Sequence, residues 1–367
     1  MFKNYLKITF RNLWKNKAYA AINIGGLAIG LTGFFLLLLY INYERDYDRW
    51  SPQLKQVYQV NETNIYSLQD TKSLWKNKCD TRIGALIRNN LAGVNAVTMI
   101  NPPYDAAEGI EADHKVFLEN ANRLRDTDSS FFKVFPYHFI SGNPDHALDK
   151  VNSMVLTESL AHKWFGSTDV VGRSVKLKTW WKDPGAYFEI TGVVRDLSSP
   201  TNVSFSAVYR SGENDKGSSD PNTTHVANIY VRLAPGQSLD VLSHQANKVY
   251  DNALGRLLQE QNTSFAKYAK SGKQYGIRFL PLQYVHLHPL NAKSIMDRIT
   301  PSLALSVLLL MIAIINFANL ATAQVVQRGK EAGVRKVLGA GKRTLIIQFL
   351  LEVAVQCIAS LVIALLM

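Results

Sequence analysis

Three long apolar segments dominate the hydrophobic pattern of this chain. Residues 18–43 and 299–327 contain no Asp, Glu, Lys or Arg, and residues 344–367 contain one charge, Glu352. Each segment exceeds the roughly 20 residues that a helix needs to cross about 30 Å of hydrocarbon. We therefore predict an integral membrane protein with three transmembrane helices over these ranges.

The region between the first two apolar segments, residues 44–298, has a mixed pattern. Alternating positions predict strands, and positions with a helical period predict amphipathic helices. The predicted strands cover residues 56–68, 96–100, 171–177, 187–197 and 226–233. The predicted helices cover residues 73–91, 153–166 and 238–261, and the first apolar helix is expected to continue as a stalk up to Pro52. This order favours an α+β domain with mostly antiparallel strands, and the polar stretch 211–223 is expected to be a mobile loop or a boundary between lobes.

The first 17 residues combine an apolar and a cationic side. Aromatic residues such as Phe10 and Trp14 share one side of a helix, and Lys3, Lys7 and Arg11 recur at four-residue steps on another. This pattern is typical of a helix that lies in the membrane interface. We predict a cytoplasmic interfacial helix over residues 1–17 that stays attached to the chain.

The net charge of +12 is concentrated in two short segments. Residues 1–17 hold five Lys or Arg and no acid, and residues 327–343 hold six against one acid. Short basic segments at the ends of spans lie on the cytoplasmic side, so residues 44–298 are expected outside the cytoplasm. The charge therefore indicates topology and contact with anionic membrane lipid, and does not favour a nucleic-acid partner.

Few residues suggest catalysis or metal binding. His286 and His288 would point to one face of a strand, but two nitrogens without further ligands make a structural strand end the better interpretation than a metal site. The segment from Gly339 to Thr344 lacks the first glycine and the hydroxyl residue of a phosphate-binding loop. Cys79 and Cys357 lie in different phases and predict no disulfide. We expect neither a catalytic residue nor a bound cofactor in this chain.

Small and polar residues inside the apolar segments are candidates for helix contacts. Gly26 and Gly30, with Gly33 one turn on, allow a second helix to approach closely, either within this chain or in a dimer seam. Asn316 and Asn319 are one turn apart and are expected to bridge to a neighbouring helix. Glu352 is an intramembrane ionisable residue, which is a functional candidate by default. It either faces the helix bundle as a hydrogen-bond acceptor or takes part in proton coupling.

Residues 328–343 connect the last two apolar segments and predict a short cytoplasmic helix. Val334, Val337 and Leu338 form one apolar stripe, Glu331 and Arg335 are spaced for an ion pair, and Gly339 suits a helix end. The alternative is a basic loop with no role beyond orientation.

Several segments resemble one known family. The run NFANLATAQVVQRGKEAGVRKVLGAGKRTLIIQFLLE (316–352) resembles the cytoplasmic hairpin of FtsX/MacB-type ABC-transporter permeases. The opening MFKNYLKITFRNLWKNKAYAAINIGGLAIGL and the segments FFKVFPYHFISGNPDHAL, VLTESLAHKWFG, VGRSVKL and FEITGVVRDL resemble other parts of that family. The resemblance covers nearly the whole chain.

The resemblance implies a bacterial inner-membrane permease whose external domain has two lobes, one inserted at about residues 105–210. It implies that a separate ABC ATPase binds ATP and Mg²⁺, and that residues 331–338 dock on that subunit. It also implies a homodimer or a pairing with a second permease half, and efflux or extraction of peptides, lipoproteins or drugs. Family members have four spans, so the chain is expected to be truncated before the fourth. A transmembrane sensor and a membrane-anchored enzyme are the alternative functions.

Overall fold

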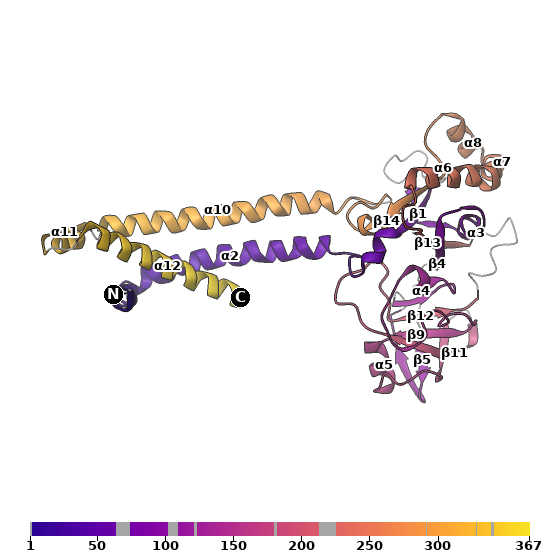
Figure 1. The fold of residues 1–367 in the computed structure, drawn as a ribbon, viewed down its shortest axis with the longest axis horizontal. Coiled ribbons are helices and arrows are strands. Elements are labelled where there is room, and N and C mark those ends of the chain that lie inside the picture. Colours follow the sequence, from indigo (N-terminus) through magenta and orange to yellow (C-terminus); the bar gives the residue numbers. More distant parts are fainter. Residues whose placement is uncertain are drawn as a thin grey trace. The chain divides into compact units, whose positions relative to one another are not determined.

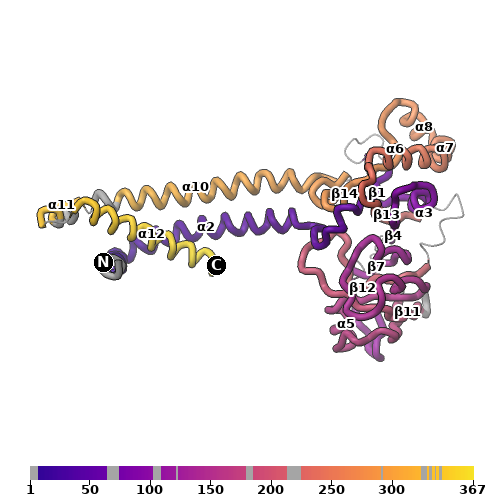
Figure 2. The backbone as a smooth tube through the Cα atoms, in the orientation of Figure 1, coloured from indigo at the N-terminus to yellow at the C-terminus, as the bar shows by residue number. Residues whose placement is uncertain are grey.

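The computed structural model describes residues 2–63, 74–101, 109–120, 123–179, 182–212, 225–290, 292–327, 329–338 and 341–367 (Figures 1 and 2). It divides into two compact units. The helical unit comprises Met1–Arg45 and Met296–Met367, and the α/β unit comprises Asp46–Ile295.

The described residues of the helical unit form the helices α1 (Phe2–Lys15), α2 (Lys17–Arg45), α10 (Met296–Gln327), α11 (Gly329–Val337) and α12 (Lys342–Leu366). Three of them, α2, α10 and α12, are long and apolar enough to cross a membrane. The α2 helix packs against both α10 and α12. The three long apolar helices predicted from the sequence are therefore present.

The first sheet of the α/β unit is antiparallel throughout its described strands. They lie in the order β14–β1–β13–β3, with β2 paired to β1 and β4 paired to β13. Their bounds are Val57–Thr63 for β1, Trp75–Lys76 for β2, Lys78–Asp80 for β3, Val94–Ile100 for β4, Val226–Leu233 for β13 and Ile277–Pro281 for β14. Helices α3 (Thr81–Asn90) and α6 (Leu239–Tyr250) cover one face and bury Ile83, Ile87 and Leu242 against it.

The second sheet is inserted in the chain between β4 and β13. Its strands lie in the order β6–β5–β10–β11–β9–β12–β7, with β8 paired to β11. Their bounds are Gly109–Ala112 for β5, Lys115–Leu118 for β6, Leu124–Asp126 for β7, Phe139–Gly142 for β8, Ser153–Thr157 for β9, Ser174–Thr179 for β10, Lys182–Val194 for β11 and Ala207–Arg210 for β12. Helix α5 (Glu158–Phe165) packs on this sheet through Leu160 and Trp164. We call these strands and α5, together with their connecting loops, the inserted lobe.

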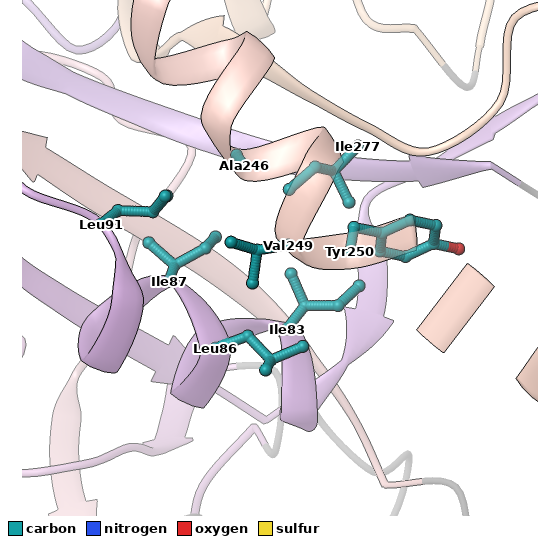
Figure 3. A pocket seen from close by; sticks show the side chains of 8 residues that line it. All are labelled: Ile83, Leu86, Ile87, Leu91, Ala246, Val249, Tyr250 and Ile277. Atoms are coloured by element: carbon teal, nitrogen blue, oxygen red, sulfur yellow. The ribbon is translucent and has the colours of Figure 1, made fainter. Parts of the chain in front are cut away.

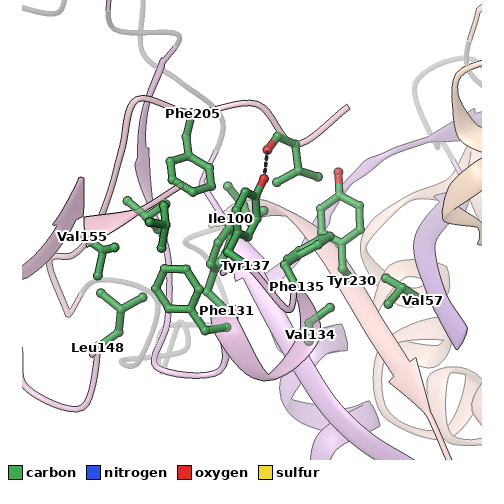
Figure 4. Packing of buried hydrophobic residues seen from close by; sticks show 14 of the residues in the cluster. Val57, Ile100, Phe131, Val134, Phe135, Tyr137, Leu148, Val155, Phe205 and Tyr230 are labelled. Carbon is green, nitrogen blue, oxygen red and sulfur yellow. Dashed lines mark hydrogen bonds between the residues drawn. The ribbon is translucent and has the colours of Figure 1, made fainter. Parts of the chain in front are cut away.

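An aromatic core lies between the two sheets (Figure 4). The short helix α4 (Phe131–Val134) contributes Phe131, whose ring is 5.6 Å from that of Phe205. Phe135 meets Tyr230 of β13 edge to face at 5.3 Å. Aromatic pairs of this kind add to the stabilisation from apolar burial. Because this core takes residues from both sheets, the two lobes of the α/β unit pack as one folded body.

The remaining named helical segments of the described residues are short. They are the 3₁₀ turn Pro52–Gln56, the π-helical turn Asp251–Gly255, α7 (Arg256–Gln261), α8 (Thr263–Lys270) and α9 (Leu282–Val285). The π turn interrupts the single helix expected over residues 238–261. Two-lobed α+β architecture is confirmed, as are the strands predicted at 96–100 and 226–233 and the antiparallel pair that became β10 and β11.

Three predictions of helix extent were wrong. Residues 75–80 are strands, and α3 begins only at Thr81, where the Asp80 side chain accepts a hydrogen bond from the Arg82 backbone amide at 2.9 Å. In the same way, β9 occupies the first part of 153–166, and Thr157 caps α5. The stalk expected up to Pro52 is absent because α2 ends at Arg45 and Asp48 has a φ of 56°. Residues 64–68 of the first predicted strand and most of the predicted loop, residues 213–223, lie outside the described residues.

Candidate functional site

The connecting helix α11 exposes its apolar residues. Val334 is 62% exposed, Val337 is 89% exposed and Leu338 is 81% exposed. Leu338 directly follows α11, and its backbone amide donates to the Val334 oxygen at 3.1 Å, so the three side chains, at i, i+3 and i+4, share one side of this helical segment. The side chains of Glu331 and Arg335 and the whole of Gly339 lie outside the described part of the structure. An apolar stripe exposed on a basic segment is a surface suited to a partner or to lipid.

Three glycines of α2 lie where this helix meets α10. A Cβ atom at Gly30 would lie 2.2 Å from the Cβ of Ala313, and one at Gly26 would lie 3.2 Å from the Asn316 side-chain nitrogen. At Gly33 the nearest atom would be a methyl carbon of Leu309 at 3.5 Å. Small residues permit such close backbone approach between helices in lipid. Asn316 and Asn319 are themselves exposed within this chain.

Helix α12 carries a buried stripe of polar side chains. Its members recur every four residues: Gln348, Glu352, Gln356 and Ser360, followed by Ala364. The Asn23 amide nitrogen of α2 donates to the Gln356 oxygen at 2.7 Å. The Ser360 hydroxyl donates to the backbone oxygen of Ile24 at 3.1 Å. The stripe therefore ties α12 to α2, and it places Glu352 on the buried side of α12.

Glu352 was expected to face the helix bundle with Gln348 or a basic loop residue as its donor, but Gln356 and Ser360 were not predicted to belong to the same face. The signal was available, because four polar residues at i, i+4 spacing within an apolar helix predict one shared face. Polar groups in a membrane span turn toward other helices because lipid offers them no hydrogen bonds.

A buried carboxylate, Asp48, stands three residues after the end of α2. Its carboxylate accepts hydrogen bonds from the Thr201 hydroxyl at 2.5 Å, from the Asn202 backbone amide at 3.1 Å and from the Asn202 side-chain nitrogen at 2.6 Å. The Asp48 amide donates to the Pro200 oxygen at 3.0 Å. Burial raises the pKa of the Asp48 carboxyl, and the hydrogen bonds from Thr201 and Asn202 oppose that rise.

The segment that leads toward α10 lies against the same place. The Gln283 side-chain nitrogen donates to the Asp48 backbone oxygen at 3.4 Å. The rings of Tyr47 and His286 are stacked, with their centroids 3.4 Å apart. Both contacts fall within the α/β unit. The local sequence pattern does not reveal these contacts, since Gln283 and Asp48 are 235 residues apart in the chain.

The two histidines make separate contacts outside any strand. His286 follows the short helix α9, so the prediction that His286 and His288 share the face of a strand was wrong. His286 stacks on Tyr47, and the His288 Nδ1 lies 3.4 Å from the Ser294 hydroxyl. Among the described residues, no group of three or more His, Cys, Asp or Glu side chains is placed to hold a metal ion.

The α/β unit also contains a buried charged group and a small cavity. The Glu62 carboxylate lies 3.2 Å from the Lys76 ammonium and 3.3 Å from the Tyr250 hydroxyl. Burial raises the pKa of the Glu62 carboxyl, which the charge of Lys76 opposes. The adjacent cavity between α3 and α6 is lined by Ile83, Leu86, Ile87, Leu91, Ala246, Val249, Tyr250 and Ile277 (Figure 3). At about 10 Å³ it is the size of one water molecule and is too small for a substrate.

Two sequence families match the chain. The family described as MacB-like periplasmic core domain matches residues 20–249, and the family described as FtsX-like permease C-terminal matches residues 303–367. No curated protein matches.

Solved structures that match part of this chain include a domain of a protein described as a permease from Porphyromonas gingivalis, with a TM-score of 0.45 and 18% identity over 63% of this chain and 92% of that chain. Two others are the periplasmic region of MacB from Actinobacillus actinomycetemcomitans (0.41, 12%, 65% and 94%) and the extracellular domain of the noncanonic ABC-type transporter YknZ from Gram-positive bacteria (0.36, 12%, 61% and 99%).

Proposed function

We propose, from the premise that this chain belongs to the FtsX/MacB-type ABC-transporter permeases, that it passes ATP-driven motion of a separate ATPase to its extracytoplasmic domain. The output of that motion is efflux or extraction of peptides, lipoproteins or drugs. ATP and Mg²⁺ bind to the ATPase subunit, and this chain supplies the docking helix, the spans and the external lobes.

The observation that carries the proposal is the exposed apolar stripe of α11. Val334 and Val337 on α11, and Leu338 directly after it, are all more than half exposed, and this segment lies between two candidate spans. Burying apolar side chains of this size in a groove of a partner stabilises a complex by roughly 1.5–3 kcal/mol each. A helix that presents an apolar face to a groove is a recurring mode of recognition. The cationic residues on the same segment keep it at the cytoplasmic surface.

A sensor is the second candidate function and is weaker. A sensor requires a signalling module after the second span, and in this chain the short helix α11 and the apolar helix α12 follow α10. We also propose that two permease units assemble around one ATPase dimer, either as a homodimer or with a second permease half.

The test is co-purification of the tagged full chain, expressed with its candidate ABC ATPase, in detergent. Val334→Asp with Leu338→Asp places two charges in the docking face and is expected to abolish recovery of the ATPase. The matched control is Val241→Asp, which adds a charge at a half-exposed valine of α6 in the external domain. Undiminished recovery of the ATPase with the double variant would refute the docking role of α11.

A further inference from the structure

We infer that Asp48 is a positioning residue that fastens the segment leaving the first span to the inserted lobe and to the segment returning to the second span. The inference rests on the proposed function, because the motion that Asp48 would transmit originates in the ATPase. The contacts of Asp48 on which it depends all lie within the α/β unit.

Asp48 connects three segments of the α/β unit by hydrogen bonds, an arrangement that we call the Asp48 clamp. The residue is fully buried and has a φ of 56°, a left-handed conformation that Asp and Asn adopt more readily than other non-glycine residues. Its carboxylate receives three hydrogen bonds from Thr201 and Asn202, in the loop between β11 and β12 of the inserted lobe. Oδ1 accepts from the Thr201 hydroxyl and the Asn202 backbone amide, and Oδ2 accepts from the Asn202 side chain, so each oxygen of this buried side chain has a hydrogen-bond partner. The backbone and the side chain of Asp48 therefore both hold this loop.

The backbone oxygen of Asp48 makes the second connection. It accepts the hydrogen bond from Gln283, and the neighbouring Tyr47 stacks on His286. Residues 283–286 precede α10, as residues 47–48 follow α2. A rotation or shift of either connection is thus opposed by contacts to the other connection and to the inserted lobe. The α2 helix ends at Arg45 and does not continue as a rigid stalk. Motion of the first span would therefore reach the α/β unit through the residues that follow α2 and through these contacts.

The Asn202 amide faces the Asp48 carboxyl group, so exchanging these two side chains between the two positions provides a test. Asn202→Asp removes the amide donor and places a second carboxyl group against that of Asp48, where two ionised carboxylates repel each other unless one of them takes up a proton. Asp48→Asn combined with Asn202→Asp exchanges the two groups and restores an amide facing a carboxylate. Asn suits the left-handed backbone at position 48. The matched control is Asn143→Asp, which makes the same charge change at an exposed residue of the inserted lobe.

The measurement is the distance distribution between spin labels on the full chain in nanodiscs. The labels replace Asp46, at the start of the α/β unit, and the half-exposed Val171 of the inserted lobe, with Cys357 changed to Ala. We expect a narrow distribution in the parent and in Asn143→Asp, a broad one in Asn202→Asp, and a narrow one again in the transposed pair. Thr201→Val, which removes one donor without adding charge, is expected to broaden the distribution less.

A second readout separates positioning from simple folding. With the ATPase bound, ATP is expected to shift the label distance in the parent and in the transposed pair but not in Asn202→Asp, while the ATPase in that complex is expected to hydrolyse ATP as it does with the parent. An unchanged distribution in Asn202→Asp, or an undiminished ATP-dependent shift in that variant, would overturn the role of Asp48. Failure of the proposed function is distinguishable, because it removes the ATP-dependent shift from the parent while the label distributions without ATP still report on the clamp.

Discussion

Gly30 of α2 and Ala313 of α10 are so close that a Cβ atom on Gly30 would lie 2.2 Å from the Cβ of Ala313. Real Cβ atoms do not approach this closely, so any side chain at position 30 must push the helices apart. The contact lies midway along the two longest helices of the helical unit. It therefore sets the distance between the first two spans.

Gly30→Val is expected to weaken this helix pair more than any conservative change nearby. Helix association in lipid depends on close packing of small residues, so separating the backbones removes contacts along the whole face. The check is thermal unfolding of the full chain in detergent, with Gly25→Val as the control, because nothing lies within 4 Å of a Cβ at Gly25. Equal losses of thermal stability in the two variants would contradict a specific contact at Gly30.

The polar pair Asn23 and Gln356 predicts a non-additive pair of mutations. Asn23→Leu leaves the buried Gln356 amide without its 2.7 Å partner and is expected to lower the free energy of unfolding by about 1 kcal/mol. The double change Asn23→Leu with Gln356→Leu removes both polar groups and is expected to cost less than the sum of the single changes. Denaturation in mixed micelles measures all four members of this cycle. Strict additivity would show that the two amides do not interact.

Glu62 predicts a pH dependence of the α/β unit. Its carboxyl is buried, and its pKa in the folded chain is raised above the ordinary value of 4.5. The folded state therefore holds the proton more tightly than the unfolded state. The stability that this group contributes is fully present below pH 4.5 and is lost as the pH rises through the raised pKa.

Glu62→Gln is expected to abolish the loss of stability that Glu62 causes as the pH rises, since a glutamine side chain does not titrate. The check is chemical denaturation of the full chain at a series of pH values, with the exposed Glu260→Gln as the matched control. A pH profile that is the same in Glu62→Gln and in the parent would rule out this contribution. Asp48 and Asp128, whose pKa values burial also raises, stay in place in both variants.

The sequence predicted those features that depend on local pattern. Apolar length was sufficient for α2, α10 and α12, and alternation was sufficient for β13, because span length and strand period are properties of short segments. The start of α3 was misplaced because residues 75–80 pair with β1 and β13, and the sequence does not reveal that pairing. The Asp48 clamp was invisible for a similar reason. A single acidic residue after a helix has no distinguishing sequence pattern, and its partners Thr201 and Asn202 are more than 150 residues away in the chain.

The membrane orientation predicts opposite labelling of two exposed positions. The chain is a multi-pass membrane protein with a large periplasmic or extracellular domain. Val241→Cys lies on α6 of that domain, and Lys336→Cys lies on α11, in the basic segment that the positive-inside rule assigns to the cytoplasm. In spheroplasts, a membrane-impermeant maleimide is expected to label Val241→Cys at once and Lys336→Cys only after the membrane is opened. The native Cys79 is fully buried and Cys357 lies within α12, so a variant with Cys357→Ala provides the background. Labelling of Lys336→Cys in intact spheroplasts would place α11 outside and leave it unable to meet a cytoplasmic ATPase.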